Sequence, residues 1–320
     1  MPIDLGKQYL GLSPAHLETV LGKVNVIIHN AWRVDFTWSL DSYEEYYLKS
    51  VRELINLSSL SPLQPRVAFV SSVSSAQEWA AVFPDSPVIE ATFESYQVSS
   101  PLGYGQSKHI AERALAMASV ACNIPVTILR LGQVAGPTDP NRVGSKWSTD
   151  EWIPSLAAIS KVLKLIPDDI PPIDWVPVDL ASRAIVELAL LGDDGCQELP
   201  PLKVFNIVNP RLSDWSTFVA AMHRRLTHDG MEAGVYRQVP LSEWVGALIR
   251  ADPAMMPDSI AKSSTKILPF FQLLVETAAR GVALHPKFET ENAVESSKTM
   301  QRMTRVDEEL ICQWLEQWGI

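Results

Sequence analysis

Cysteine is scarce in this chain, which has three cysteines in 320 residues. Cys122, Cys196 and Cys312 lie far apart, and no two of them have the Cys-x-x-Cys spacing of a zinc or redox motif. We therefore expect reduced thiols in a cytoplasmic protein rather than a disulfide framework. No other cluster of metal-ligating residues is evident, so we expect no metal site.

Long apolar runs and basic clusters are also lacking. No run of 18 apolar residues occurs, and no basic stretch leads into an apolar one at the N-terminus, so we expect neither a membrane span nor a secretory signal. The net charge of −10, without clustered Lys or Arg, argues against a nucleic-acid surface. Hydrophobic residues make up 47% of the chain, which is typical of one large or two modest globular domains.

The N-terminal part alternates short apolar segments with helical ones. Runs rich in β-branched residues predict strands at Val24–His29, Arg66–Ser71 and Val126–Arg130. The spacing of apolar residues predicts helices at Tyr43–Leu60 and from Tyr104 to about Cys122. This alternation is typical of a parallel sheet with helices on its faces. Ligands of such sheets bind outside the carboxyl ends of the strands.

Several chemically useful residues fall at those carboxyl ends. Asn30, Ser72 and Gly132 follow the three strands, and Tyr104 opens the second helix. Tyr104 and Lys108 are four residues apart, so their side chains leave one face of that helix. An ammonium group favours the phenolate, so we expect Lys108 to lower the pKa of Tyr104 and make it a proton donor near neutral pH. The spacing alone is common by chance, and an exposed surface pair is the plainer interpretation.

The second half of the chain is mostly helical. A break near Ala135 indicates a sheet-bearing N-terminal part and a helical cap. We interpret Pro257–Ile260 as a loop. Strands are predicted at Ile173–Asp179 and Val204–Val208, and helices at Trp152–Leu165, Leu180–Leu191, Trp215–Leu226, Leu241–Arg250, Ile267–Val282 and Asp307–Trp318.

Five motifs together carry a resemblance. They are VIIHNA (Val26–Ala31), FVSSVSS (Phe69–Ser75), YGQSK (Tyr104–Lys108), LRLGQVAG (Leu129–Gly136) and IDWVPVD (Ile173–Asp179). Their order resembles that of an extended short-chain dehydrogenase/reductase. The chain is similar, more narrowly, to the thioester reductase domains that end fungal polyketide synthases, nonribosomal peptide synthetases and aminoadipate-reductase-type enzymes. The narrower resemblance rests on Leu10-Gly11-Leu12, Gly136-Pro137, Trp152, Pro154, Ser155, Ser297, Trp314 and Trp318.

The resemblance implies an α/β fold with a Rossmann-like, doubly wound parallel sheet that lacks its first two βα units, and a mostly helical C-terminal substrate cap. Residues 1–135 would form a partial NAD(P)-binding domain. Residues 136–320 would form the cap, with elements at about 173–210 returning to complete the sheet.

The resemblance also assigns catalytic roles. Tyr104 would be the general acid that protonates the oxygen of the reduced carbonyl, and Lys108 would lower its pKa and bind the nicotinamide ribose. Ser72 would hold the carbonyl oxygen, with Ser71 as the alternative.

The implied cofactor is NADPH. Asn30 and Ala31 would line it, and Asp4 and Leu5 would approach the adenine. The full set of implied cofactor-binding residues is Asp4, Leu5, Asn30, Ala31, Ser71, Tyr104, Lys108, Gly132, Gln133 and Val134, of which the last three would present backbone groups to the carboxamide.

Two departures from the family pattern stand out. The Gly-x-x-Gly-x-x-Gly loop that holds a pyrophosphate is lacking, because Gly6, Gly11 and Gly22 do not have its spacing. The chain begins where the third strand of the fold would end, so Val24–His29 would become an exposed sheet edge. A family asparagine that helps to relay the proton is replaced by Ser50. We expect a truncated reductase that is active when a second polypeptide completes the sheet, or an inactive one.

The leading functional hypothesis is NADPH-dependent reductive release of a carrier-bound acyl or peptidyl thioester as an aldehyde or alcohol. The cap and the segment from Gly136 to Trp152 would bind the phosphopantetheine arm. The alternatives are an acyl-CoA reductase or epimerase-like enzyme, and a catalytically impaired remnant that acts as a binding partner. Plainer interpretations make the serine cluster a turn, His29 a core histidine and the tryptophans packing residues.

Overall fold

The computed structural model describes residues 2–139, 146–192, 201–228 and 236–320. The chain forms two compact units, each built from three segments. The first unit comprises Met1–Gly132, Ala181–Val208 and Pro286–Arg302. The second comprises Gln133–Leu180, Asn209–His285 and Met303–Ile320.

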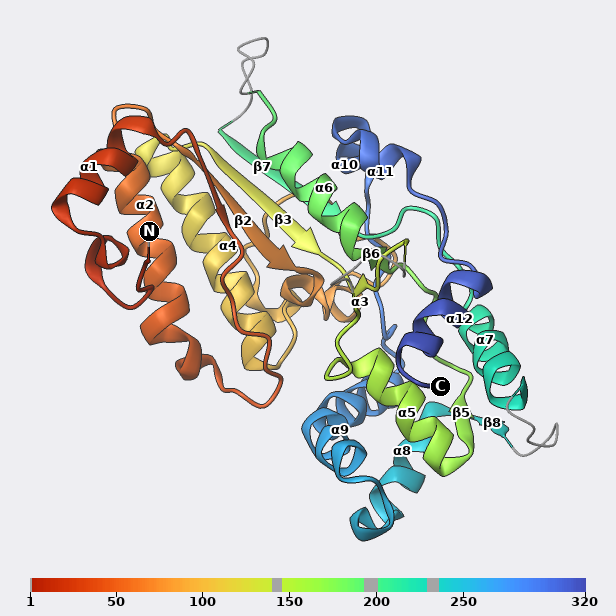
Figure 1. Ribbon diagram of the computed structural model, residues 1–320. Helices are drawn as coiled ribbons and strands as arrows, with labels where there is room; N and C mark the ends of the chain where they lie inside the picture. The colour runs from red at the N-terminus through yellow and green to blue at the C-terminus, as the bar shows by residue number, and fades with distance from the viewer. Residues whose placement is uncertain (1, 140–145, 193–200, 229–235) are drawn as a thin grey trace. The chain divides into compact units, whose positions relative to one another are not determined.

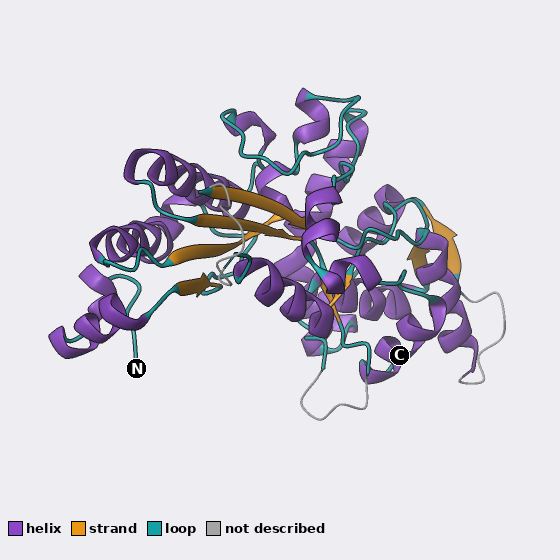
Figure 2. Ribbon diagram, turned by 90° about the horizontal axis from the view of Figure 1, so that it is seen from above, coloured by secondary structure: helices purple, strands orange, loops and turns teal. Residues whose placement is uncertain are grey.

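The first unit is built on a parallel sheet with strand order β1-β2-β3-β7 (Figure 2). These strands are β1 Val26–His29, β2 Arg66–Ser72, β3 Val126–Leu131 and β7 Leu202–Ile207, which confirms the predicted segments to within two residues. Ser72 of β2 lies opposite Leu131, so β2 and β3 end at the same level, and β1 ends three residues earlier, with His29 opposite Phe69. The predicted α/β class is confirmed.

Helices α2 and α4 pack against each other and against β2, and α4 also packs against β3 (Figure 1). Their apolar residues, among them Leu54, Leu57 and Leu115, are buried with Phe69 and Ile128 in one core cluster. The helices of this unit are η1 Gln8–Gly11, α1 Pro14–Lys23, η2 Leu40–Tyr43, η3 Glu44–Leu48, α2 Lys49–Leu60, η4 Val73–Ala76, α3 Trp79–Val82, η5 Tyr96–Val98, α4 Gly103–Cys122, most of α6 Val178–Ala189, α10 Glu291–Ser296 and α11 Lys298–Arg302.

Strand β1 lies at one edge of this sheet as the described residues form it. It pairs with β2, and the side chain of its Ile28 is 41% exposed. An exposed apolar edge with free backbone groups is a template for pairing with another strand.

The second unit has two short two-stranded sheets and a helical core. Strand β4 Val134–Ala135 pairs with β6 Val176–Pro177, and β5 Leu165–Pro167 pairs with β8 Arg237–Val239. Its helices are α5 Trp152–Leu163, α7 Trp215–His228, α8 Leu241–Arg250, η6 Pro253–Met255, α9 Asp258–Ala279 and α12 Glu308–Gln317. The core is aromatic: Trp175, Trp215, Trp244, Trp314 and Phe218 are all buried in it.

Three boundaries predicted for the second half were wrong. Helix α9 begins at Asp258 rather than at Ile267, so the segment interpreted as a loop is its first turn, where Asp258 complements the helix dipole. Helix α5 stops at Leu163 because Lys164 adopts a left-handed conformation with φ 57°. The strand predicted over Ile173–Asp179 is limited to β6, since α6 already begins at Val178.

Cys122 and Cys312 are free thiols, and Cys196 lies outside the described residues. Within the part of the chain that the structure describes, no helix is long and apolar enough to cross a membrane. The same residues contain no group of three or more His, Cys, Asp or Glu side chains that could hold a metal ion.

Candidate functional site

The site in the first unit is organised by the N-terminus of α4. Two glycines allow this helix to begin where it does. A Cβ on Gly103 would lie 2.4 Å from the Trp38 carbonyl oxygen, and one on Gly105 would lie 2.7 Å from the Ser74 carbonyl oxygen. The first turn of α4 therefore contacts both the loop after β1 and the serine segment after β2, and Tyr104 lies between these two glycines in the sequence.

The hydroxyl of Tyr104 is hydrogen-bonded to the side chain of Ser72. Ser72 ends β2, and its Oγ also accepts a hydrogen bond from the backbone N–H of Ser74 at 3.2 Å. The Tyr104 ring is buried, with the Phe36 ring edge-on at 6.0 Å between centroids. The structure thus brings together the two hydroxyls that the sequence predicts to hold and protonate a carbonyl oxygen.

Lys108 lies one turn further along α4 and is also buried. Its Nζ donates a hydrogen bond to the Val70 carbonyl oxygen at 2.6 Å and lies 5.9 Å from the Tyr104 ring centroid. Burial lowers the pKa of Lys108 to about 7, although Glu112 opposes this shift. Two N–H groups of the ammonium remain for other acceptors.

The expectation that Lys108 lowers the pKa of Tyr104 was wrong. Burial raises the pKa of Tyr104, and the hydrogen bond with Ser72 offsets this effect in part. Lys108 is directed at the Val70 carbonyl, and its own charge is costly in the same buried environment. Tyr104 is therefore a protonated phenol at neutral pH, which is the form that an acid catalyst needs.

Ser71 does not face the same way as Ser72. Its Oγ donates to Glu112 Oε1 at 2.5 Å, and Ser75 Oγ donates to the same oxygen at 2.7 Å. Glu112 forms a fully buried ion pair with Arg130, whose guanidinium nitrogen lies 2.7 Å from Oε2. This geometry favours Ser72 over Ser71 as the hydroxyl beside Tyr104.

Sequence reasoning missed Glu112 and Arg130. Arg130 Nη2 also donates to the Ala91 carbonyl oxygen at 2.7 Å. The pair therefore connects α4 and β3 with Ala91 and, through the hydrogen bonds that Glu112 accepts, with Ser71 and Ser75. A signal was present, because Glu112 follows Lys108 by four residues on the same helix face.

His29 and Ser50 form a second polar contact at the end of β1. Ser50 Oγ donates to the Tyr47 carbonyl oxygen at 2.7 Å, so the 3.2 Å contact with His29 Nε2 places the shared hydrogen on the imidazole. Burial, reinforced by Lys108, lowers the pKa of His29 to about 4. His29 is thus a neutral, hydrogen-bonded core residue.

The residues predicted to line a cofactor fall into two groups. Asn30 and Ala31 follow β1 and are exposed. Gly132 donates its N–H to the Ile207 carbonyl oxygen at 2.9 Å, and a Cβ there would meet Val208, so it serves the contact between β3 and β7.

Four further residues predicted to bind the cofactor, Asp4, Leu5, Gln133 and Val134, contact other parts of their own units. In the second unit, Gln133 donates to Glu151 and accepts from Trp152 Nε1, and Val134 belongs to β4. In the first unit, Asp4 forms an exposed ion pair with Lys7 at 3.2 Å. Leu5 packs against the cluster beneath α2.

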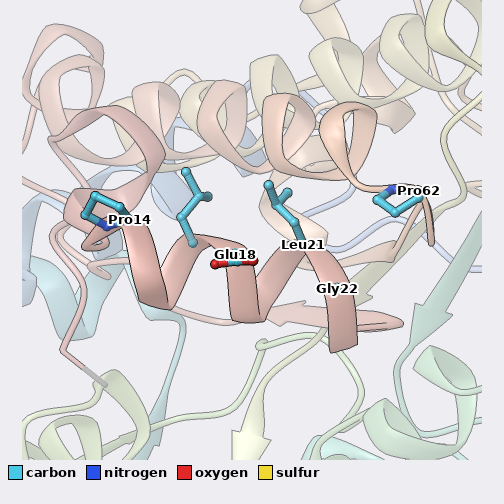
Figure 3. Close-up of a pocket in the computed structure, with 6 residues that line it drawn as sticks. Pro14, Glu18, Leu21, Gly22 and Pro62 are labelled. Atoms are coloured by element: carbon cyan, nitrogen blue, oxygen red, sulfur yellow. The ribbon is translucent and has the colours of Figure 1, made fainter.

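An apolar pocket of about 400 Å³ lies along α1, between this helix and Pro62, which follows α2 (Figure 3). Its lining includes none of the predicted site residues and one charged side chain, Glu18. The lining residues are Pro14, Leu17, Glu18, Leu21, Gly22 and Pro62. Glu18 is the single acid–base group among these lining residues, and none of them has a hydroxyl, thiol or amine nucleophile.

The donor set suits the nicotinamide-ribose end of a dinucleotide. Tyr104 and Lys108 present a hydroxyl and an ammonium, and Asn30 and Ala31 are exposed at the end of the neighbouring strand. The sequence has no Gly-x-x-Gly-x-x-Gly loop, so no residue of this chain is assigned to a pyrophosphate.

Comparison with known proteins gives the class: this chain belongs to the NAD-binding family described as Male sterility protein, whose model matches residues 1–185. The carboxylic acid reductase of Neurospora crassa is 28% identical over 322 residues, which cover 99% of this chain and 29% of that protein. The adenylate-forming reductase Nps10 of Heterobasidion annosum is 30% identical over 331 residues, which cover 98% of this chain and 28% of that protein. The chain thus spans less than a third of these relatives.

Solved structures give the same fold. The terminal R domain from the myxalamid PKS-NRPS biosynthetic pathway has a TM-score of 0.77 at 23% identity, covering 100% of this chain and 74% of that one. A thiolation-reductase di-domain from an archaeal nonribosomal peptide synthetase has a TM-score of 0.71 at 16% identity, covering 100% of this chain and 61% of that one. The predicted resemblance to reductase domains of synthetases is confirmed.

Proposed function

We propose that this chain reduces a carrier-bound acyl thioester to an aldehyde with NADPH. The observation that carries the proposal is the hydrogen-bonded pair of Tyr104 and Ser72, with Lys108 one helical turn away. The names of the relatives support it, because they are a carboxylic acid reductase and adenylate-forming reductases.

In the proposed reaction, the hydroxyls of Ser72 and Tyr104 hold the thioester carbonyl oxygen. A bound nicotinamide cofactor supplies the hydride. Tyr104 donates its proton to the oxygen as negative charge develops there. Loss of the C–S bond then gives an aldehyde and a thiol, so one hydride and one proton are consumed for each thioester.

The second unit serves, in this proposal, as the substrate cap. The predicted cap, residues 136–320 apart from the elements near 173–210 that return to the sheet, coincides with most of this unit, but Pro286–Arg302 belongs to the first unit. We propose that the phosphopantetheine arm binds along the segment from Gly136 to Trp152. Residues 140–145 of that segment lie outside the described residues. The hydrogen bond from Trp152 Nε1 to Gln133 Oε1 supports an ordered wall at its end.

The edge of β1 suggests a further partner. We propose that a strand from a second polypeptide, or from further sequence of the same protein, pairs with this edge. The exposed Ile28 and the free outward backbone of β1 in the described sheet support the proposal.

The function is tested with NADPH carrying deuterium on the transferred position. The same acyl group is offered as a carrier-protein thioester, as a coenzyme A thioester and as the free acid. We expect a deuterated aldehyde from the carrier-bound thioester, at a higher kcat/KM than from the coenzyme A thioester. Preference for the coenzyme A thioester would favour an acyl-CoA reductase. No labelled product from any substrate would contradict the proposal and favour a binding role.

A further inference from the structure

The ammonium of Lys108 lies among aromatic rings. Its Nζ is 4.5 Å from the centroid of Trp32 and 4.7 Å from that of Phe69. Lys108 is 3% exposed, and it donates a hydrogen bond to the Val70 carbonyl oxygen. The face of an aromatic ring carries negative charge, so these rings attract the charged form of a buried amine.

Trp32 is held in place by contacts of its own. Its Nε1 donates to Ser107 Oγ at 3.3 Å, and that hydroxyl donates to the Tyr104 carbonyl oxygen at 2.7 Å. The Trp32 ring also lies 5.3 Å from the Tyr47 ring. These contacts tie Trp32 to the same turn of α4 that carries Lys108.

We propose that Trp32 is a positioning residue whose ring face holds the Lys108 ammonium beside Tyr104 and favours its charged form. The inference concerns the geometry of Lys108, and its consequence for turnover rests on the function proposed above. Phe69 is the second ring, but it belongs to the core of the sheet, whereas Trp32 stands in the loop that follows Asn30 and Ala31.

The charged groups around Lys108 do not by themselves decide its protonation state at neutral pH. Glu112, on the same helix, raises the pKa of Lys108, but Arg130 on β3 is paired with that carboxylate. His29 at the end of β1 is neutral near pH 7, because burial and Lys108 lower its pKa to about 4. Tyr104 remains a neutral phenol. Since the pKa of Lys108 is about 7, a modest attraction changes its charged fraction at neutral pH.

The test is an NMR titration of the whole chain with ¹³Cε-labelled lysine, in which the Lys108 signal is assigned by its loss in Lys108→Met. Trp32→Leu removes the ring, and Trp32→Phe retains a weaker one. We expect Trp32→Leu to lower the pKa of Lys108 by about 0.5–1.5 pH units and Trp32→Phe to lower it less. Both variants lose the hydrogen bond to Ser107, so their difference reports the ring.

Trp38→Leu is the matched control. Trp38 stands in the same loop and also contacts Tyr43, but its cation is Arg33 at 4.4 Å. We expect this variant to leave the pKa of Lys108 unchanged. An unchanged or raised pKa in Trp32→Leu would overturn the inference, as would equal shifts in the Leu and Phe variants. These titrations need no turnover, so they decide the role of Trp32 even where the proposed function fails. Where the chain is active, the basic limb of its kcat/KM profile should move to lower pH by the same amount in Trp32→Leu.

Discussion

Replacing Glu112 with glutamine should destabilise the first unit strongly. Glu112 is 2% exposed and Arg130 is fully buried, and their closest nitrogen and oxygen atoms are 2.7 Å apart. Burial raises the pKa of Glu112, but Arg130, Ser71 and Ser75 outweigh this and hold it below the usual range. The carboxylate is therefore charged at neutral pH, and it neutralises a guanidinium that has no access to water.

The size of the effect follows from what the substitution leaves behind. Glutamine keeps the shape but removes the charge, so Arg130 stays buried without an anion. Breaking one side of a buried pair costs about 3–5 kcal/mol. Because domains are stable by about 5–15 kcal/mol, Glu112→Gln should remove more than half of the free energy of unfolding at the lower end of that range and about a fifth to a third at the upper end.

Hydrogen exchange in a urea series, followed for peptides of α4, measures this free energy within the first unit. Glu187→Gln is the control: Glu187 accepts hydrogen bonds from Ser297 and Thr299 but is only partly buried, so its loss should cost about 1 kcal/mol. The double substitution Glu112→Leu with Arg130→Met should recover stability relative to Glu112→Gln, because both charges are then absent. Equal losses in Glu112→Gln and Glu187→Gln would refute the reasoning.

Three further predictions concern the same unit. Gly105→Ala should lower the melting temperature and the activity together, because its Cβ would lie 2.7 Å from the Ser74 carbonyl oxygen. Gly22→Ala, with open space around it inside α1, should lower neither, and normal activity in Gly105→Ala would contradict the proposed close contact. Ile28→Lys should reduce the particle mass measured by light scattering wherever copies of the chain pair through β1, because a charge on an exposed edge opposes strand pairing. A mass above that of the monomer that does not fall in Ile28→Lys would show that the copies do not associate through the edge of β1. Acidification from pH 7 to 5 should lower the free energy of unfolding of the wild type by up to about 2 kcal/mol more than that of His29→Gln. The pKa of His29 is about 4 in the folded chain and 6.5 in the unfolded chain, so the unfolded chain binds the proton first. An equal pH dependence of the free energy of unfolding in the two proteins would contradict this prediction.

The sheet could be predicted because buried parallel strands are continuous apolar runs. VNVIIH and RVAFVS show this pattern locally, and each lies within two residues of the observed strand. The start of α4 could also be predicted, because Pro101 and Gly103 indicate a helix N-terminus in the sequence. The start of helix α9 was not predicted, because Pro257–Ile260 was interpreted as a loop, whereas Pro257 is the residue that precedes the first turn. The predicted helix from Ile267 already included Pro269, which lies inside α9.

The electrostatics of the site could not be predicted from spacing. The positions of Tyr104 and Lys108 give a shared helix face, but the acidity of Tyr104 depends on burial that distant segments supply. Phe36 covers its ring from the loop after β1, and the partners of Glu112 come from β2, η4 and β3. Trp32 shows the same limit, because nothing in its neighbourhood along the chain indicates that it meets Lys108.

The central claim is that Tyr104 donates the proton in a reduction. Its most direct test is the turnover of an acyl thioester with NADPH by Tyr104→Phe, compared with Tyr96→Phe, whose tyrosine is 61% exposed. We predict that Tyr104→Phe lowers kcat by about 10²–10⁴-fold with little change in unfolding temperature, while Tyr96→Phe retains wild-type kcat. A Tyr104→Phe variant that keeps the wild-type kcat would contradict the account.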